Sequence, residues 1–152
     1  LFPDHPNSLS LLFLGIPMII STGLPDIIMP VSGRAELNSL APDMKALSAL
    51  SEEYRVVGVH PFAPDTSREV TAYTRDFAPL YGINEEAATG TASGALAYYL
   101  YLNNLITKDT DLCFVQGEAM NRASKIAVRI RNDGSIQVGG SAAVLAEGEI
   151  HI

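Results

Sequence analysis

One segment of the chain carries no charged side chain and is apolar on every side. It runs from Ala87 to Thr107, and its small and apolar residues predict a helix over Thr89–Asn104. A helix without a polar face belongs inside a domain, where other elements cover it on all sides. Buried Tyr98, Tyr99 and Tyr101 then need partners for their hydroxyl groups, or a route to solvent.

Short strand patterns lie on both sides of this helix. We expect strands at Met18–Ser21, Asp26–Val31, Arg55–Phe62, Glu69–Phe77, Leu112–Gln116, Lys125–Arg131, Ser135–Val138 and Ala142–Ile152. Pro64–Ser67 connects the third and fourth of them. Asn132–Gly134 is typical of a tight hairpin turn, and Gly139–Gly140 suits a bulge or a second turn. Leu9–Leu14 fits a short helix or a strand equally well.

Two further helices are expected outside the sheet. Ser32 caps a short one, with Glu36 in its first turn, and Pro42 suits the first position of the next. In the second helix, apolar residues recur every three or four positions, which is typical of a helix packed on a surface. These residues are Met44, Leu47, Leu50 and Tyr54. The sequence therefore predicts an α+β fold, in which mostly antiparallel strands wrap one central apolar helix.

Size and charge narrow the function classes. The chain has 152 residues, of which 47% are hydrophobic and 18% charged, as in a single globular domain. Its net charge is -7 and its Lys and Arg residues are scattered, so we expect no nucleic-acid partner. The lone Cys113 permits no internal disulfide, and the cytosol is the default compartment. The apolar run Leu9–Ile20 is too short to cross a bilayer, so no membrane partner is expected.

The start of the predicted helix is the strongest candidate for ligand binding. The first turn of a helix leaves backbone N–H groups unpaired, and the helix dipole adds partial positive charge there. Gly90 and Ala92 would let a carboxylate or phosphate approach those amides closely. Tight packing of a capped helix start explains the same residues without a ligand. A P-loop is disfavoured, because no Lys follows the glycines.

Other titratable residues give weaker indications. Glu85 and Glu86 precede the helix, where the helix dipole stabilises carboxylates. One of them could also transfer protons if burial raised its pKa. His5, His60 and His151 are dispersed and show no metal-ligand spacing, so none is assigned to catalysis or to a metal.

Three stretches occur together in an order typical of one family. They are Ile-Ser-Thr-Gly-Leu-Pro at residues 20–25, the segment Arg75–Ala92, and Gln-Gly-Glu at residues 116–118. The middle segment resembles the PhzF signature, in which Arg-x-Phe-Ala-Pro leads to Glu-Asp-Pro-x-Thr-Gly-Ser-Ala and a central helix. The resemblance covers about residues 16–152. It places the chain with phenazine-biosynthesis-like isomerases of the diaminopimelate-epimerase superfamily.

This resemblance implies a fold and an activity. Members have two similar lobes, each a curved, mixed sheet or barrel around a central helix, with the active site between them. They are isomerases or epimerases that need no cofactor and move a proton on a small carboxylate-bearing substrate. Residues 17–152 would form the C-terminal lobe, and residues 1–16 an arm or a remnant of the interlobe segment. A start at Leu1 rather than Met suggests an upstream part. The acid/base Glu and a partner N-terminal lobe would lie there, and a homo-oligomer is expected.

The resemblance also assigns site residues. Glu86 takes the place of the family's catalytic Asp, one methylene longer, while Ala87 replaces its Pro and Ser93 stands where His is common. The expected substrate-binding residues are Thr89, Gly90, Thr91 and Ala92, together with Ser21, Thr22 and Gly23. Two alternatives remain open: a non-catalytic module that binds a small anion, and a structural lobe that associates with itself.

Overall fold

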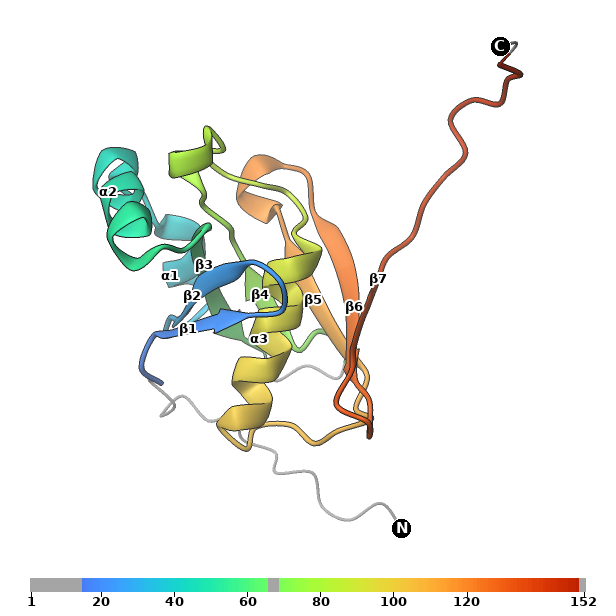
Figure 1. Cartoon of the computed structure of the whole chain (residues 1–152), viewed down its shortest axis with the longest axis horizontal. Helices are drawn as coiled ribbons and strands as arrows, with labels where there is room; N and C mark the ends of the chain where they lie inside the picture. Colours follow the sequence, from blue (N-terminus) through green and yellow to red (C-terminus); the bar gives the residue numbers. More distant parts are fainter. Residues whose placement is uncertain (1–14, 66–68, 151–152) are drawn as a thin grey trace.

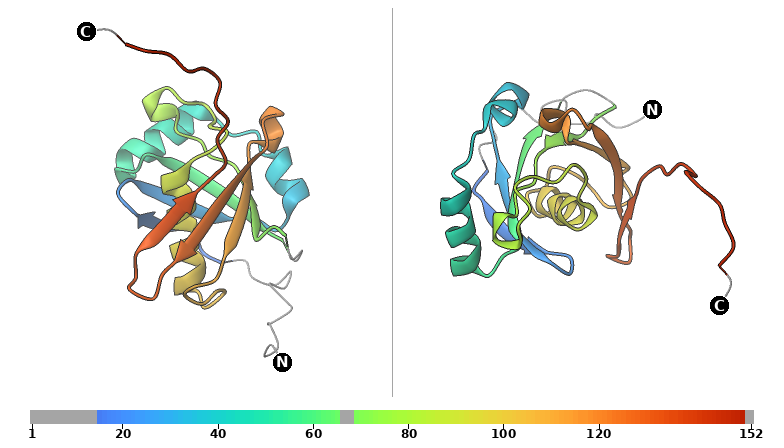
Figure 2. Two further views of the ribbon diagram at one scale, coloured as in Figure 1. Left: turned by 90° about the vertical axis from the view of Figure 1, so that its right-hand side faces the viewer. Right: turned by 90° about the horizontal axis from the view of Figure 1, so that it is seen from above.

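Seven strands form one curved sheet around a single helix, α3 (Gly90–Leu102), in a computed structural model that describes residues 15–65 and 69–150. Figure 1 shows α3 in front of the middle strands of the sheet, with the first hairpin of the sheet crossing it, and Figure 2 shows the sheet curving around the helix. The strands are β1 (Met18–Ser21), β2 (Pro25–Pro30), β3 (Gly58–Pro64), β4 (Ala72–Thr74), β5 (Leu112–Gln116), β6 (Ser124–Ile130) and β7 (Ile136–Gly139). They lie side by side in chain order.

The connections explain why the sheet is mixed. β2 pairs in parallel with β3 and β4 with β5, while the other four pairings are antiparallel. Parallel neighbours need a long crossover. The first crossover contains α1 (Arg34–Ser39) and α2 (Met44–Tyr54), and the second contains α3. Short 3₁₀ turns occur at Pro79–Tyr81 and Glu118–Met120. The predicted fold class is therefore confirmed.

The core lies between α3 and the concave face of the sheet. Phe62 of β3 meets Tyr99 of α3 edge to face, with ring centroids 5.4 Å apart. The Tyr99 hydroxyl donates to the carbonyl of Ile16 over 3.1 Å, which answers the expected need for a partner. α3 is not covered on every side, however. Tyr98 and Leu102 are 39% and 44% exposed, because β1 and β7 form the two edges of an open sheet.

The helix starts differ from the prediction. Gly33, not Ser32, is the N-cap of α1, although Glu36 does lie in its first turn. Asp43 caps α2, and its carboxylate accepts from the amides of Lys45 and Ala46 over 2.9 and 3.0 Å. Pro42 therefore precedes the helix instead of opening it, because the carboxylate of the next residue satisfies the first free amides.

The two central strands are shorter than predicted. β3 begins at Gly58 rather than Arg55, because Arg55 is the C-cap of α2 and its left-handed φ of 55° does not fit a strand. β4 covers only Ala72–Thr74 of the predicted Glu69–Phe77. Beyond it, the chain keeps a single bridge to β3 at Phe77. The predicted connection Pro64–Ser67 falls partly outside the described residues.

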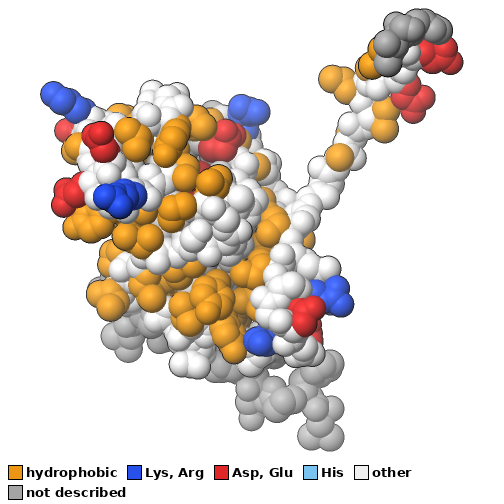
Figure 3. Space-filling model, in the orientation of Figure 1, with side chains coloured by type: hydrophobic (Ala, Val, Ile, Leu, Met, Phe, Trp, Pro, Cys, Tyr) orange, Lys and Arg blue, Asp and Glu red, His pale blue; other side chains and the backbone are white. Residues whose placement is uncertain are grey.

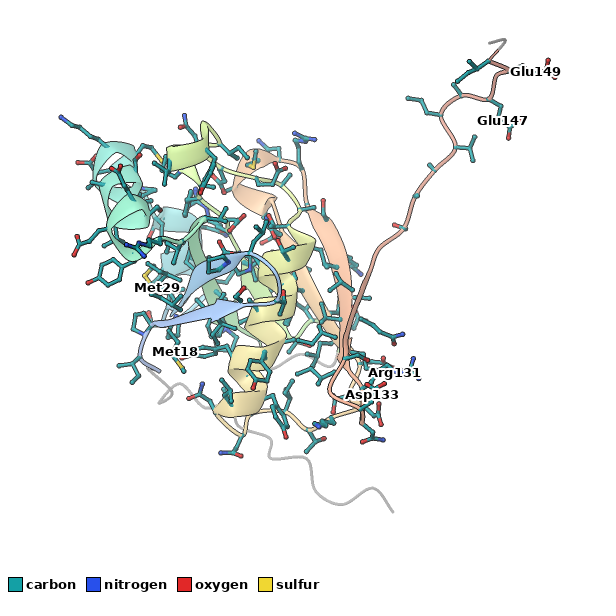
Figure 4. The ribbon with its side chains drawn as sticks, in the orientation of Figure 1. Met18, Met29, Arg131, Asp133, Glu147 and Glu149 are labelled. Carbon is teal, nitrogen blue, oxygen red and sulfur yellow. The ribbon has the colours of Figure 1, made fainter. Side chains whose placement is uncertain are left out.

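The end of the chain leaves the sheet. Asn132–Gly134 makes the predicted hairpin between β6 and β7, with Gly134 at a φ of 86°. After Gly139 the backbone forms neither a bulge nor a strand, and Figure 4 shows Glu147 and Glu149 far from the body. The strand predicted from Ala142 is wrong over residues 142–150, since no described strand pairs with it. Leu9–Leu14, most of the predicted arm and residues 151–152 lie outside the described residues.

Candidate functional site

The N-terminal tip of α3 is open and rich in unpaired donors. Gly90 and Thr91 are exposed, and Thr89 is the N-cap but makes no side-chain capping bond. Within the described chain, no acceptor takes a hydrogen bond from the amides of Gly90, Thr91 or Ala92. Three free donors at the positive end of a helix favour a negatively charged ligand.

The loop between β1 and β2 lies against this tip. The hydroxyl of Thr22 donates to the carbonyl of Thr91 over 3.0 Å, and the amide of Gly23 donates to the Ser21 hydroxyl over 3.2 Å. Gly94 makes room for the loop, because a Cβ there would lie 3.2 Å from the Thr22 hydroxyl oxygen. The structure thus brings together two segments about seventy residues apart that the resemblance assigned to one site.

The two glutamates before α3 have different surroundings. Glu85 receives two bonds of 2.8 Å from the guanidinium of Arg75, a buried side chain that also donates to the carbonyls of Leu37 and Leu40. Glu85 is therefore a structural anchor of the loop. The Glu86 carboxylate is half-buried, and among the described residues it accepts only from the neighbouring Ala87 amide, over 2.9 Å. Of the two, Glu86 is free to act on a ligand.

Two expected site residues, Ala92 and Thr89, turn their side chains into the protein. Ala92 is fully buried, so its side chain offers no surface to a ligand in this structure. The hydroxyl of Thr89 donates to the Asp76 carboxylate over 2.7 Å and accepts from the Gln116 amide over 3.0 Å. Its hydrogen-bonding capacity is used within the protein, so Gly90 and Thr91 are the residues left to meet a ligand.

Beneath the tip lies a buried polar network that the sequence did not predict. Asp76 is 6% exposed, and its second carboxylate oxygen lies 3.1 Å from Nδ1 of the fully buried His60. Gln116, also fully buried, accepts from the Thr89 amide over 3.2 Å and donates to the Glu86 carbonyl over 2.8 Å. The network therefore holds both ends of the segment that leads into α3.

A second carboxylate faces the same network from β2. Asp26 is 3% exposed, and the sheet register places it diagonally across from His60. Burial, and next the nearby Asp76 carboxylate, raises the pKa of Asp26 from 3.8 to about 6, although His60 and the Gly58 backbone act in the opposite direction. Nε2 of His60 has no partner among the described residues.

The sequence contained partial signals for these residues. Asp76 occupies the variable position of the Arg-x-Phe-Ala-Pro segment, and Gln116 opens the Gln-Gly-Glu stretch. His60 was expected to be a packed or surface histidine, and it is packed. A polar residue between apolar neighbours in a predicted strand marks a buried position that needs a partner. Its partner Asp76 lies in the segment after β4, sixteen residues away, so spacing along the chain could not identify the network.

Comparison with known proteins identifies the family. A family model described as phenazine biosynthesis-like protein matches residues 12–148. The chain belongs to the PhzC/PhzF family. A Deinococcus radiodurans protein of this kind, named only as an uncharacterized isomerase, is 37% identical over 91% of this chain and 47% of its own length. The trans-2,3-dihydro-3-hydroxyanthranilate isomerase of Pseudomonas aeruginosa is 32% identical over 78% of this chain and 41% of its own length.

The solved structures agree with the family. A structure from Pseudomonas aeruginosa, named as a predicted epimerase, superposes with a TM-score of 0.61 at 28% identity, over 86% of this chain and 46% of that one. This PhzF-family chain thus spans about half the length of the curated relatives it matches first. The family membership supports an isomerase or epimerase class.

A well-defined hollow of this family member lies away from the α3 tip. A groove of about 660 Å³ separates α2 from the outer face of β1 and β2. It is lined by apolar residues that include Ile19, Ile27, Met29, Leu47, Leu50 and Tyr54. Figure 3 shows apolar side chains gathered over this side of the molecule. Since no acid or base lines the groove, it fits a covering partner better than a reaction centre.

The described residues form neither a metal-ligand cluster nor a membrane-spanning helix. Over residues 15–65 and 69–150, no three His, Cys, Asp or Glu side chains come together in a way that could hold a metal ion. In the same ranges no helix has the length and apolar character needed to cross a bilayer.

Proposed function

We propose that this chain is the C-terminal lobe of a PhzF-like isomerase that moves a proton on a small, carboxylate-bearing metabolite. The observation that carries the proposal is the exposed tip of α3, where Gly90 and Thr91 have free amides a few residues after Glu86, whose carboxylate has the Ala87 amide as its partner among the described residues. Family membership supplies the reaction class, and the tip supplies a place for the substrate's charge.

The proposed roles follow from the chemistry of each group. The amides of Gly90 and Thr91 donate to the substrate carboxylate, and the Thr91 hydroxyl, exposed beside them, adds a third donor. Holding that carboxylate stabilises the negative charge that spreads into it when a neighbouring carbon loses its proton. Glu86 accepts or returns a proton at the substrate. The reaction conserves all atoms, because the proton leaves one carbon and another proton is delivered to a different position.

The second half of the site belongs to another lobe in this proposal. The chain covers about half of its first relatives, and the resemblance assigns the main acid/base Glu to the N-terminal lobe. The substrate would lie between that Glu and the α3 tip. The proposal includes a cytosolic location and no cofactor, and it expects this chain to be inactive without the other lobe.

Solvent-deuterium exchange tests this function. The full-length parent protein is incubated in D2O with trans-2,3-dihydro-3-hydroxyanthranilate and with a panel of small carboxylic acids, and deuterium incorporation is followed by mass spectrometry. We expect incorporation into at least one acid, and a loss of about 100-fold or more in Glu86→Gln. Glu53→Gln, an exposed change on α2, is the matched control and should exchange normally. A folded parent protein that exchanges no acid in the panel contradicts the proposal.

A structural role without chemistry is the second candidate, and the apolar surface favours it. The groove beside α2 and the exposed Tyr98 and Leu102 of α3 leave carbon surface that a monomer rarely shows. Under this alternative, two copies of the chain cover each other. Sedimentation of the 152-residue chain should then show a dimer, whereas a strict monomer argues against it.

A further inference from the structure

We propose that Asp76 is a positioning residue that draws the Thr89 hydroxyl away from the first turn of α3 and so keeps the amides of that turn free for a ligand. The inference rests on the proposed function, because it concerns the same helix tip. It explains why a threonine stands at the N-cap and yet does not cap.

A threonine at the N-cap ordinarily satisfies the helix itself. Its side-chain oxygen accepts from the amide of the second or third helical residue, here Thr91 or Ala92. In this structure the Thr89 backbone is extended, at φ −125° and ψ 103°, which is compatible with capping, but the bond is absent. The hydroxyl instead donates to Asp76 over 2.7 Å. The free amides at the tip therefore depend on where one hydroxyl points.

Asp76 is held so that it can perform this task. One of its oxygens contacts Nδ1 of His60 and the other accepts from Thr89, so each carboxylate oxygen has its own partner. Asp76 accepts from Thr89, so we assign the donor in the contact with His60 to the Nδ1–H group. His60 is fully buried on β3 and cannot swing away. The carboxylate is thus fixed by a strand rather than by the loop it serves.

Gln116 of β5 completes the arrangement from the opposite side. Its amide nitrogen donates to the Thr89 hydroxyl over 3.0 Å and to the Glu86 carbonyl, and its oxygen accepts from the Thr89 amide. Thr89 is therefore held by both its side chain and its backbone. Removing Asp76 leaves the Thr89 hydroxyl with the Gln116 bond alone and without its acceptor, so the side chain can rotate and cap α3 in competition with any ligand.

Three variants of the full 152-residue chain test the inference: Asp76→Ala, Thr89→Val and the double variant. The first readout is hydrogen exchange of the Thr91 and Ala92 amides without ligand. The second is the affinity for benzoate, a small carboxylate probe, measured from amide shifts at the tip. We expect Asp76→Ala to slow exchange at one of the two amides and to weaken benzoate binding about fivefold, as a gained cap would.

The double variant separates positioning from general damage. Valine at position 89 has no hydroxyl and cannot cap, so the double variant should regain wild-type benzoate affinity to within about twofold, even though it carries more changes. A purely structural role for Asp76 predicts no such recovery. If Asp76→Ala does not fold, Asp76→Ser replaces it, because a serine keeps a polar group near His60 but is too short to reach Thr89.

The possible results distinguish the two proposals. Unchanged exchange at Thr91 and Ala92 in the Asp76 variant, or no recovery in the double variant, overturns the positioning role and leaves the proposed function standing. If amide exchange changes as expected in the Asp76 variant but the wild-type tip does not bind benzoate, the proposed ligand site is overturned and the positioning role stands.

Discussion

The two ends of α3 are built from different kinds of residues. Around its C-terminal half, Phe62, Tyr99 and Leu100 make a dry core in which the buried hydroxyl of Tyr99 has a backbone partner. Around its N-terminal end, the buried side chains include Asp76, His60 and Gln116: Asp76 contacts His60 directly and is linked to Gln116 through the Thr89 hydroxyl. We call the surroundings of the C-terminal half of α3 the apolar pole and those of its N-terminal end the polar pole.

This difference separates stability from function. Apolar burial is non-directional and strong, so the C-terminal half can hold the fold. A buried polar network adds little net stability, but it gives each group one defined position. That is what a ligand site needs. The contrast makes predictions that differ in size and in kind between the two ends.

The largest effect is expected at the apolar pole. Leu100→Ala leaves a cavity in the core and should lower the free energy of unfolding by about 2–5 kcal/mol, measured by urea denaturation. Leu102→Ala, two residues along the same helix but 44% exposed, is the control and should cost less than about 1 kcal/mol. Equal losses in the two variants would show that the C-terminal half is not a packed core.

A smaller loss of stability is expected at the polar pole, together with a change at the site. Gln116→Ala removes the partners of the Thr89 amide and the Glu86 carbonyl, at a cost of about 1–3 kcal/mol. Backbone amide shifts at Gly90 and Thr91 should change with it. Gln137→Ala, on the exposed face of β7, should leave both stability and those shifts unchanged. Unaltered tip amides in Gln116→Ala would break the proposed link between network and tip.

The polar pole should also respond to pH in an unusual direction. Because the pKa of Asp26 is raised to about 6 in the folded state, the folded protein binds more protons than the unfolded chain between that pH and 3.8. This group alone should therefore add about 1 kcal/mol of stability as the pH falls from 7 to 5. Urea denaturation of Asp26→Asn should lack that gain.

Asp133 provides a control of opposite sign. Hydrogen bonds from Ser135 lower the pKa of this exposed carboxylate, so its contribution is lost as the pH falls through the folded-state value. Asp133→Asn should therefore make the protein slightly less sensitive to acid.

If the stability of Asp26→Asn changes between pH 7 and 5 in the same way as that of the wild type, the polar pole does not contain a buried carboxylate with a raised pKa.

The smallest effect is expected at the surface of the tip. Thr22→Val removes an exposed hydrogen bond to the Thr91 carbonyl and should cost no more than about 1 kcal/mol. Thr107→Val, at an exposed hydroxyl away from the tip, is the control. If thermal denaturation shows a loss of several kcal/mol in Thr22→Val, the loop between β1 and β2 is part of the core rather than a cover of the site.

Local pattern predicted the apolar pole well. The uncharged run from Ala87 gave α3 to within a residue or two at each end, and Asn132–Gly134 gave the hairpin, because both signals reside in neighbouring residues. The solvent-exposed side of α3 at Tyr98 was not predicted, because the residues of a helix do not indicate whether the surrounding sheet closes over it. The tail beyond Gly140 was misread for a related reason: an alternating sequence forms a strand only beside a partner.

The polar pole was only partly predictable. The free amides of Gly90 and Thr91 follow from helix geometry alone, and the loop at Thr22, which the resemblance assigned to the site, lies against the tip of α3. The inward-pointing hydrogen bonds of the Thr89 side chain could not be predicted from the sequence. They depend on His60 and Gln116, which lie on separate strands, β3 and β5, and join one hydrogen-bond network only in the folded sheet.

The central claim is that the N-terminal tip of α3 accepts a carboxylate. An NMR titration of the ¹⁵N-labelled chain with benzoate tests it most directly. The predicted result is a saturable shift centred on the amides of Gly90 and Thr91, with smaller changes in the Ser21–Gly23 loop. Shifts centred instead on the groove between α2 and β2, or no shift at the tip at any benzoate concentration, would contradict it.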